Sequence, residues 1–420
     1  MTSTPQEEGG AVPAAQRSGW AAFIKSLASV SGDLYSMTAP PFILSPVSLT
    51  GMSKARKSVT DPTEFPAYWL ERPELFAAIA EGVDAEDRAL RVLKWFISTL
   101  KGQYTSRNEK MGSEKKPLNP VLGELFYGTW PDRNGRGETK LLVEQVSHHP
   151  PITAYYITNE SRHLTLQGHN AQKTQFSSGS ILVKQVGHAI LTYHPPGKEA
   201  EKYLITLPRL RIDGIWYGAP YIELTDNGFI QSSTGYLSTL EYKGKGYFSG
   251  KAHSIKATVT SLDNPGLSVV VDGQWDTTTK VTSSTGSKRA KSGSTFTDVT
   301  SSKEEVTVAP LESQGEWETR KIWEKVANGI RTGDFDSASK DKTRIENEQR
   351  QRRKDEAAAG TPWQLKHFLH VEDDPDCESL FVQGWCYRTK RILPDNSLAA
   401  MFKSNIVPTE DCYVYKPDAA

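Results

Sequence analysis

Length, composition and charge already exclude several classes of protein. The chain has 420 residues, of which 37% are hydrophobic and 32 are glycine, so it can bury a sizeable core and is not disordered in bulk. Lysine and arginine number 50, as do aspartate and glutamate. The formal charge of zero provides no global field for a polyanion and argues against a general nucleic-acid binder.

The N-terminal region is expected to contain one short helix but no membrane span. Apolar side chains recur at helical spacing after a small, polar stretch of sixteen residues, and the opposite side is polar. The uncharged stretch 34–53 contains three prolines, so it is not predicted to cross a membrane, and residues 39–46 are expected to be extended. The apolar face of the predicted helix consists of Trp20, Phe23, Ile24 and Leu27.

Two further helices are predicted before residue 105. The first spans 73–82, because Pro73 suits a first turn and Gly82 suits a helix end. The second spans 85–104 and carries a strong apolar stripe.

A series of short strands is predicted from about residue 123 to 299. Runs rich in Thr, Val, Ile, Tyr and Phe alternate with turns, which indicates ten or more antiparallel strands in a meander that closes around a cavity. The Ser/Thr/Gly/Lys-rich segment 277–295 is expected to be an exposed excursion. Helices are predicted again after residue 310: one up to Gly333 and a long polar one over 337–359.

The string EQVSHHPP, residues 144–151, is the most distinctive motif. His148 and His149 end a predicted strand, and the two prolines fix the backbone that follows. From spacing alone a simple turn is the leading interpretation, an anion site comes second, and a metal site last, since adjacent strand residues point to opposite faces and neither HxH nor HExxH accompanies the pair. The three cysteines lie far downstream, at 377, 386 and 412, and form neither a disulfide framework nor a metal motif, which favours a reducing cytosol.

Two more clusters could bind an anion. Lys116 and Asn119 lie in SEKKPLNP, where a solvated loop is the simpler interpretation. Lys342, Glu346 and Arg350 are four residues apart and therefore share one helix face, which alone indicates no more than a surface ion-pair ladder.

Together these motifs are similar to those of a known family. EQVSHHPP, SEKKPLNPVLGELFYGTW and a GDF-containing helical segment resemble the lipid-binding domain of the oxysterol-binding protein-related family, and the whole chain resembles its short, yeast-type members. The resemblance implies an α+β, mainly β fold: a large antiparallel near-closed β-barrel with a lipid tunnel. It implies a lid over 1–32, a helical segment over 33–122, the barrel over 123–300, and a C-terminal helical subdomain and tail over 301–420.

The resemblance also assigns binding residues. A phosphoinositide headgroup site is implied at Lys116, Leu118, Asn119, His148, His149, Lys342, Glu346 and Arg350. A sterol tunnel is implied at Trp69, Gln103, Tyr104, Asn170 and Gln185. The N-terminal helix would be the lid.

The function implied is non-enzymatic exchange of sterol, of ergosterol or cholesterol type, and phosphatidylinositol 4-phosphate between cytosolic membrane surfaces. No catalytic residue, metal or cofactor is implied, and the protein is expected to be a monomer in peripheral contact with Golgi, endoplasmic reticulum or other endomembranes. Two alternatives stay open: a lipid sensor that acts through a partner, and a phosphoinositide-hydrolysing enzyme that uses His148 or His149.

Overall fold

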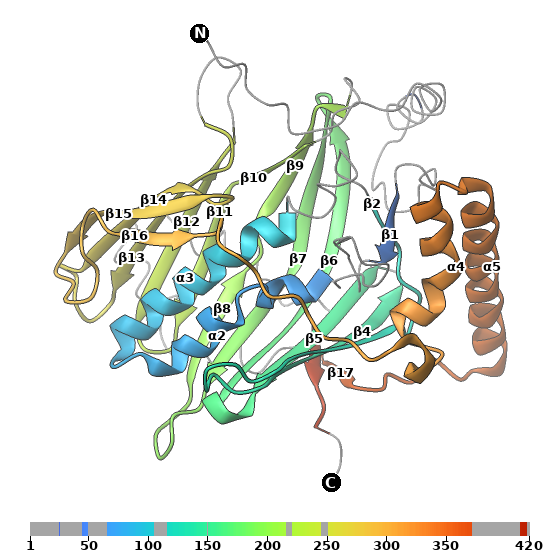
Figure 1. The fold of residues 1–420 in the computed structure, drawn as a ribbon, viewed down its shortest axis with the longest axis horizontal. Coiled ribbons are helices and arrows are strands. Elements are labelled where there is room, and N and C mark those ends of the chain that lie inside the picture. The colour runs from blue at the N-terminus through green and yellow to red at the C-terminus, as the bar shows by residue number, and fades with distance from the viewer. Residues whose placement is uncertain are drawn as a thin grey trace.

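One curved antiparallel sheet dominates the molecule, with helices on its inner face and a helical pair at one end (Figure 1). The computed structural model describes residues 25, 44–48, 65–104, 116–148, 150–215, 221–244, 251–371 and 412–417. The predicted lid residues Trp20, Phe23, Ile24 and Leu27 lie outside these ranges.

The sheet contains fourteen strands, and neighbouring strands pair antiparallel. Its hydrogen-bonded order is β16-β15-β14-β13-β12-β11-β8-β7-β6-β5-β4-β3, with β9 on β7 and β10 on β9. The strands are β3 Leu125–Trp130, β4 Thr139–His148, β5 Pro151–Asn159, β6 Leu164–Ser177, β7 Ser180–Tyr193, β8 Glu201–Thr206, β9 Arg209–Asp213, β10 Tyr221–Thr225, β11 Asn227–Ser232, β12 Tyr236–Lys243, β13 Ser254–Ser261, β14 Ser268–Gln274, β15 Thr278–Thr285 and β16 Thr295–Asp298.

Alternation along the strands separates two packed faces. On β5, Tyr155 and Ile157 belong to the main core inside the sheet. Ile152 and Ala154 belong instead to an outer cluster with Phe368, at the start of β17 (Phe368–Val371), which pairs with β18 (Cys412–Tyr415). Because successive side chains of a strand point to opposite faces, the apolar residues of β5 alternate between the inner core and the outer cluster.

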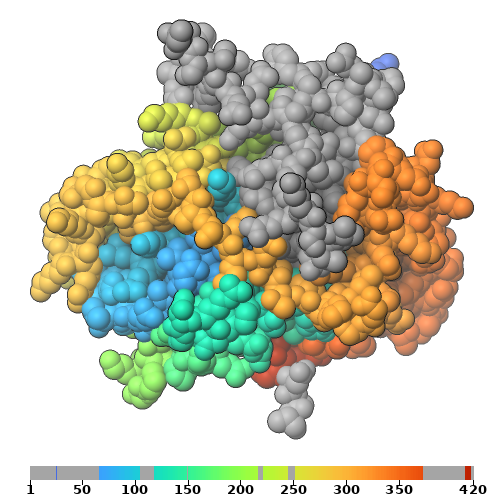
Figure 2. All heavy atoms as spheres, in the orientation of Figure 1, coloured from blue at the N-terminus to red at the C-terminus, as the bar shows by residue number. Residues whose placement is uncertain are grey.

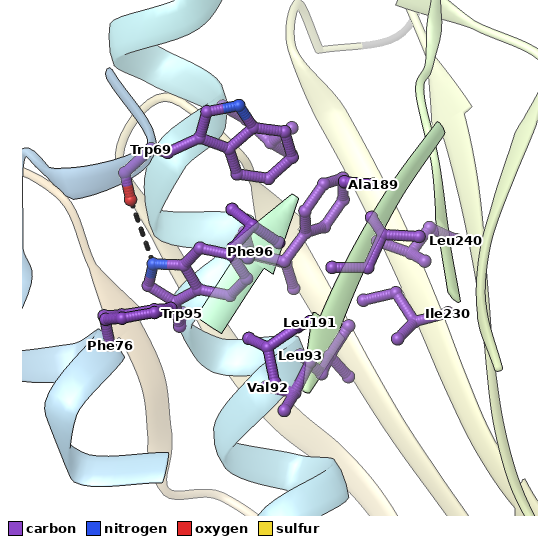
Figure 3. Packing of buried hydrophobic residues seen from close by; sticks show 14 of the residues in the cluster. Trp69, Phe76, Val92, Leu93, Trp95, Phe96, Ala189, Leu191, Ile230 and Leu240 are labelled. Carbon is purple, nitrogen blue, oxygen red and sulfur yellow. Dashed lines mark hydrogen bonds between the residues drawn. The ribbon is translucent and has the colours of Figure 1, made fainter. Parts of the chain in front are cut away.

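Helix α3, Ala85–Tyr104, lies on the inner face of the sheet, within the bounds that the sequence predicts. Its buried residues point in almost every direction around the helix axis, since strands surround one side and α2 and a 3-10 turn cover the other. Figure 3 shows Val92, Leu93, Trp95 and Phe96 packed toward strand residues of the same core. Side chains of a helix thus fill much of the space that a wide sheet would leave empty.

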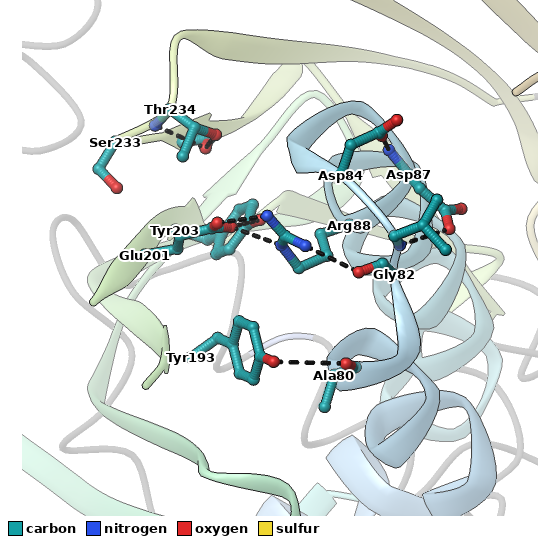
Figure 4. A network of polar contacts seen from close by, with 12 residues as sticks. Ala80, Gly82, Asp84, Asp87, Arg88, Tyr193, Glu201, Tyr203, Ser233 and Thr234 are labelled. Atoms are coloured by element: carbon teal, nitrogen blue, oxygen red, sulfur yellow. Dashed lines mark hydrogen bonds and ion pairs between the residues drawn. The ribbon is translucent and has the colours of Figure 1, made fainter. Parts of the chain in front are cut away.

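The N-terminal end of α3 is fixed to β8 by polar contacts (Figure 4). Arg88 donates to Glu201 from Nε at 2.8 Å and from Nη2 at 2.5 Å, and from Nη1 to the Gly82 carbonyl at 2.7 Å. The Tyr203 hydroxyl donates to Glu201 at 3.0 Å. A helix of this length extends about 30 Å, so its other end reaches a different region of the interior.

The two end strands of the sheet, β16 and β3, are not paired with each other. Segment 299–318 passes between them, and Thr129 on β3 exchanges backbone hydrogen bonds with Thr307 at 2.8 and 2.9 Å. We call this region, the segment 299–318 between β16 and β3, the seam. Figure 2 shows the surface of the blue helical segment between the yellow and the teal strands, so helices fill the gap that the sheet leaves open.

The predicted near-closed antiparallel sheet is therefore confirmed, although it is not strictly closed. The first predicted helix is shorter than expected: α2 spans Pro73–Ala77 and a 3-10 turn, η5, spans Ala78–Glu81. The predicted excursion over 277–295 is wrong for its first half, where β15 lies with Thr279 and Val281 buried between β14 and β16, and correct for residues 286–294, which form a loop at the surface.

The helical pair at the end of the sheet contains α4, Thr319–Thr332, and α5, Phe335–Ala359. The apolar stripe of α4 is buried as predicted, and Gly333 ends the helix in the left-handed conformation with φ of 78°. Strands β1 (Leu44–Ser48) and β2 (Lys116–Leu118) pair in parallel and lie beside this pair (Figure 1). The other 3-10 helices of the described chain are η4 Phe65–Leu70, η7 Glu160–Arg162 and η9 Leu311–Ser313.

In the part of the chain that the structure describes, no helix combines the length and the apolar character that crossing a bilayer requires. The four-part division drawn from the sequence remains a prediction.

Candidate functional site

A pocket opens on the inner side of the sheet, between η4, the C-terminal end of α3 and strands β4 to β6. The cavity that a water-sized molecule can enter measures about 30 Å³; a figure of about 520 Å³ results when the gaps between side chains and the open solvent at the mouth are counted as well. Predicted tunnel residues from three separate segments line it. The lining residues are Pro66, Trp69, Gln103, Gln145, Pro151, Thr153, Tyr155, Asn170, Ala171 and Gln172.

Close packing of η4 on α3 places Trp69 beside Gln103. Gly102 permits this approach, because a Cβ there would lie 2.3 Å from a Glu71 oxygen and 2.9 Å from the Tyr68 ring. The Trp69 ring stacks on Trp95 with centroids 5.5 Å apart, and Trp95 Nε1 donates to the Trp69 carbonyl at 3.0 Å (Figure 3). The indole of Trp69 is therefore held rigidly as one wall of the pocket.

A buried polar network joins three of the predicted tunnel residues. Gln185 Nε2 donates to the Tyr104 hydroxyl and to the Pro208 carbonyl, both at 2.8 Å. Gln185 Oε1 accepts from Asn170 Nδ2 at 3.0 Å. Amide and phenol groups in an otherwise apolar chamber can hydrogen-bond one ligand hydroxyl, directly or through water. Gln103 Nε2 donates to Thr99 Oγ1 at 2.7 Å, which fixes the remaining predicted side chain.

Sequence reasoning predicted only three of the ten lining residues, and those it missed include Gln145, Thr153 and Tyr155. Gln145 and Thr153 face each other across β4 and β5, and the Thr153 hydroxyl donates to Gln145 Oε1 at 2.6 Å. Thr153 and Tyr155 are two apart on one strand, so the alternation after EQVSHHPP could have indicated them. Burial raises the pKa of the Tyr155 phenol, so this group stays neutral.

The three predicted residues of α5 form the expected ladder. Glu346 lies between two cations: it pairs with Lys342, and its Oε2 is 3.8 Å from Arg350 Nη2. Arg350 Nη1 also donates to Asn347 at 2.5 Å. The exposed Arg350 and the more buried Lys342 thus present positive charge along one line of the helix.

Strand β2 is joined to α5 through a small core. Leu118 is fully buried in a cluster with Trp323 of α4 and Ile345 of α5, while Asn119, the next residue, is exposed. This arrangement agrees with a role for the backbone at 118 and for the side chain at 119. The backbone of Lys116 belongs to β2, but its side chain lies outside the described structure.

The histidine pair is described only in part. His148 ends β4, opposite Pro151, which lines the pocket. His149 lies outside the described residues. A shared site for His148 and α5 therefore remains a prediction.

The first residue of EQVSHHPP has a structural contact. Glu144 is fully buried and accepts hydrogen bonds from the backbone N–H groups of Lys366 and His367, both at 2.8 Å. Burial raises the pKa of its carboxyl group, and the two backbone donors oppose that shift. Glu144 thereby ties the segment after α5 to the strand that carries His148.

Among the described residues, no three histidine, cysteine, aspartate or glutamate side chains are grouped as a metal site would require.

Fold and site together define a protein that encloses a small pocket within a curved antiparallel sheet and has, at one end of that sheet, a helix with the ladder of Lys342, Glu346 and Arg350. The sequence model of the family described as oxysterol-binding protein matches residues 22–329. The chain belongs to the oxysterol-binding protein family.

Similar proteins support this assignment over most of the chain. Protein KES1 of Mycosarcoma maydis is 54% identical over 413 residues, which cover 98% of each chain. Protein kes1 of Schizosaccharomyces pombe is 44% identical over 364 residues, 86% of this chain and 89% of that protein.

Solved structures share the fold at lower identity. The Osh1 ORD domain in complex with ergosterol aligns with a TM-score of 0.63 at 22% identity, covering 83% of each chain. The same domain with cholesterol gives 0.65 at 21% identity, covering 88% of each chain. The Osh3 ORD of Saccharomyces cerevisiae in complex with PI(4)P gives 0.63 at 20% identity, covering 91% of this chain and 96% of that one.

Proposed function

We propose that this protein is a non-enzymatic lipid carrier that exchanges a sterol for phosphatidylinositol 4-phosphate between cytosolic membrane surfaces. The observation that carries the proposal is the Gln185 network with Tyr104 and Asn170, buried beside an apolar pocket inside the sheet. Three solved structures of two relatives, Osh1 with ergosterol and with cholesterol and Osh3 with PI(4)P, support this choice of ligands.

The energetic benefit of such a carrier follows from the hydrophobic effect. Exposing some fifteen methylene groups to water costs about 12 kcal/mol, at ~0.8 kcal/mol per group. An enclosed apolar pocket removes most of that cost without making or breaking a covalent bond. Sterol and acyl chains would compete for the same interior, and this competition makes exchange possible.

The headgroup would bind at the basic end of the molecule, to Lys116, Asn119, His148, His149, Lys342 and Arg350. Hydrogen bonds from charged donors to phosphate contribute roughly 1.5 to 3 kcal/mol each. Glu346 would orient its two cationic neighbours or accept an inositol hydroxyl. Zero formal charge suits a peripheral monomer that has to leave anionic membranes after loading.

The apolar face of Trp20, Phe23, Ile24 and Leu27 would act as a lid. Deletion of residues 1–29 is expected to weaken lipid retention and slow transfer, because the pocket would then stay open to water. Release of a preloaded fluorescent sterol measures the effect. An unchanged release rate in the truncated protein would remove the lid from this mechanism.

The decisive experiment uses donor vesicles with a fluorescent sterol and acceptor vesicles with phosphatidylinositol 4-phosphate. Catalytic amounts of protein should move both lipids in opposite directions. The double variant His148→Ala, His149→Ala should lose phosphoinositide extraction and keep sterol extraction, whereas the exposed His194→Ala should behave as wild type. Stoichiometric binding without transfer would indicate a sensor, and release of inorganic phosphate with turnover would indicate an enzyme.

A further inference from the structure

One arginine on α5 packs against two tryptophans that are distant in sequence and contact each other. The guanidinium carbon of Arg352 lies 4.6 Å from the ring centroid of Trp317 and 4.4 Å from that of Trp363. The two ring centroids are 5.0 Å apart at 56°. Arg352 Nη2 donates to the carbonyl of Leu122 at 2.7 Å, and Nε lies 3.3 Å from Glu356. We call Arg352, Trp317 and Trp363 the clamp.

The clamp contacts the turn that follows β2. Trp363 lies directly on Gly123, where a Cβ would be 2.3 Å from the indole, and Gly123 has φ of 80°. Trp317 accepts a backbone hydrogen bond from Leu125 at 2.8 Å. Arg352 therefore joins α5, the segment before α4 and the segment after α5 to one turn, residues 119–124.

This turn connects the two regions assigned to ligand binding. One end carries Asn119 of the proposed headgroup site. At the other end, Gly123 N–H donates to the carbonyl of Gln145 and Gln145 N–H donates to that of Glu124, both at 2.9 Å. The side chain of Gln145 lines the pocket. The turn is thus fixed to the sheet on one side and to α5 on the other.

Arg352 is two residues beyond Arg350 and six beyond Glu346 on one continuous helix. Fixing the helix at residue 352 therefore fixes the distance from its cationic face to Asn119, since a helix moves as a rigid body over so few residues. A guanidinium suits this role because its plane stacks on aromatic rings while its edge donates hydrogen bonds.

We propose that Arg352, held by Trp317 and Trp363, is a positioning residue for phosphoinositide recognition: it sets the spacing between the α5 cations and the 116–119 segment without touching the ligand. The proposal rests on the proposed function, because it presumes that the headgroup binds between these elements.

The test compares variants that alter the clamp with and without a change in charge. Trp363→Leu removes one aromatic face and leaves the charge unchanged, Arg352→Met removes the guanidinium, and Arg352→Lys keeps the charge alone. Trp363→Phe restores a ring. Arg353→Met is the matched control, because Arg353 is exposed and its loss changes the net charge equally.

Affinities for soluble short-chain phosphatidylinositol 4-phosphate and for a fluorescent sterol are measured with the thermal unfolding temperature of each variant. Trp363→Leu and Arg352→Met should each weaken phosphoinositide binding about tenfold and leave sterol binding within about twofold. Trp363→Phe should recover most of the affinity, Arg352→Lys should stay impaired, and Arg353→Met should match wild type. The double variant Trp363→Leu, Arg352→Met should bind phosphoinositide no more weakly than the poorer of the two single variants, because both changes break the same interaction.

Two results would overturn the positioning role while the proposed function stands. One is wild-type phosphoinositide affinity in Trp363→Leu, whether or not Arg352→Lys also binds with wild-type affinity. The other is a parallel fall of both affinities and of the unfolding temperature, which would mean a general structural role. Failure of the proposed function looks different: wild-type protein would then bind no phosphatidylinositol 4-phosphate, and both proposals would fall.

Discussion

Gln185 shows how one side chain can serve both stability and recognition. Its amide has partners on α3, on β6 and in the segment before β9, so three elements converge on one residue. A ligand hydroxyl entering the pocket would meet polar groups that are already oriented, which limits the entropy lost on binding.

Replacement of Gln185 by Leu should destabilise the protein and weaken sterol binding. The change removes two hydrogen bonds that the amide donates and the acceptor of Asn170, and buried polar groups that lose partners cost about 1–3 kcal/mol. Urea unfolding and fluorescent sterol titration measure the two effects. Gln175→Leu, at an exposed position of β6, is the control and should change neither. Unaltered sterol affinity in the Gln185 variant would separate this network from recognition.

Two glycines with positive φ differ only in their surroundings. Gly123, with φ of 80°, has the Trp363 indole against it, whereas Gly135, with φ of 71°, has nothing within 4 Å of the point that a Cβ would occupy. Alanine at either site should cost about 1–2 kcal/mol in backbone strain. At Gly123 the displaced indole should add about 1–3 kcal/mol. Equal unfolding free energies for Gly123→Ala and Gly135→Ala would show that Trp363 moves aside freely.

At the residue scale the sequence alone could predict little of the site. The predicted tunnel residues span positions 69 to 185 and meet only because α3 lies inside the sheet, so their assignment depended on family resemblance. The ladder at Lys342, Glu346 and Arg350 was predictable from helical spacing. The clamp was not, since no local pattern relates Arg352 to Trp317.

Among the elements, helix α3 links the two ends of the interior. Its first turns are tied to β8 through Arg88, and its last turn places Gln103 in the lining of the pocket and Tyr104 in the Gln185 network. Any displacement of its anchored end would be transmitted along the helix, because buried side chains surround it.

Glu201→Gln should therefore lower the free energy of unfolding by about 1–3 kcal/mol, because a charge-assisted bidentate pair becomes a neutral contact. The bond to Glu201 is also what raises the pKa of Arg88 above its ordinary value. Chemical denaturation provides the measurement. Glu199→Gln, at an exposed position two residues earlier, loses the same charge and should leave stability unchanged. A similar loss in both variants would point to net charge instead of the pair.

The helices and most strands were predicted well, because their apolar residues follow a regular period, whereas one strand of polar composition was not. The stripes of α3 and α4 gave correct helices because burial follows the helical period. Strand β15 was missed because its Ser, Thr and Lys residues are typical of loops, and only cross-strand bonds to β14 and β16 make it a strand.

At the scale of the whole molecule, the seam is the place where side-chain hydrogen bonds, and not strand pairing, hold the chain against the neighbouring elements. Arg72 is buried and donates to the carbonyls of Ser98 at 3.1 Å, Val299 at 2.8 Å and Ser301 at 3.3 Å. It therefore holds the chain leaving β16 against α3, where no strand pairing is available.

Arg72→Met should open the seam locally. The side chain keeps its apolar length but leaves three carbonyls without their donor, at a cost of about 2–4 kcal/mol. Hydrogen exchange should accelerate in peptides covering 296–307 more than in β5 or β6. Arg133→Met serves as the control, because Arg133 is largely exposed. Uniform acceleration over the whole sheet would contradict a local role.

The position of α3 inside the sheet also matters during protein synthesis. The helix leaves the ribosome before any strand of the fourteen-stranded sheet that will cover it. Its apolar residues stay uncovered until the last strand, which ends at Asp298, has been made close to two hundred residues later. At 5–20 residues per second that interval lasts about 10 to 40 s. The apolar stripe of this helix is thus exposed for far longer than secondary structure needs to form. The nascent chain is accordingly expected to depend on chaperones until the sheet can wrap around α3.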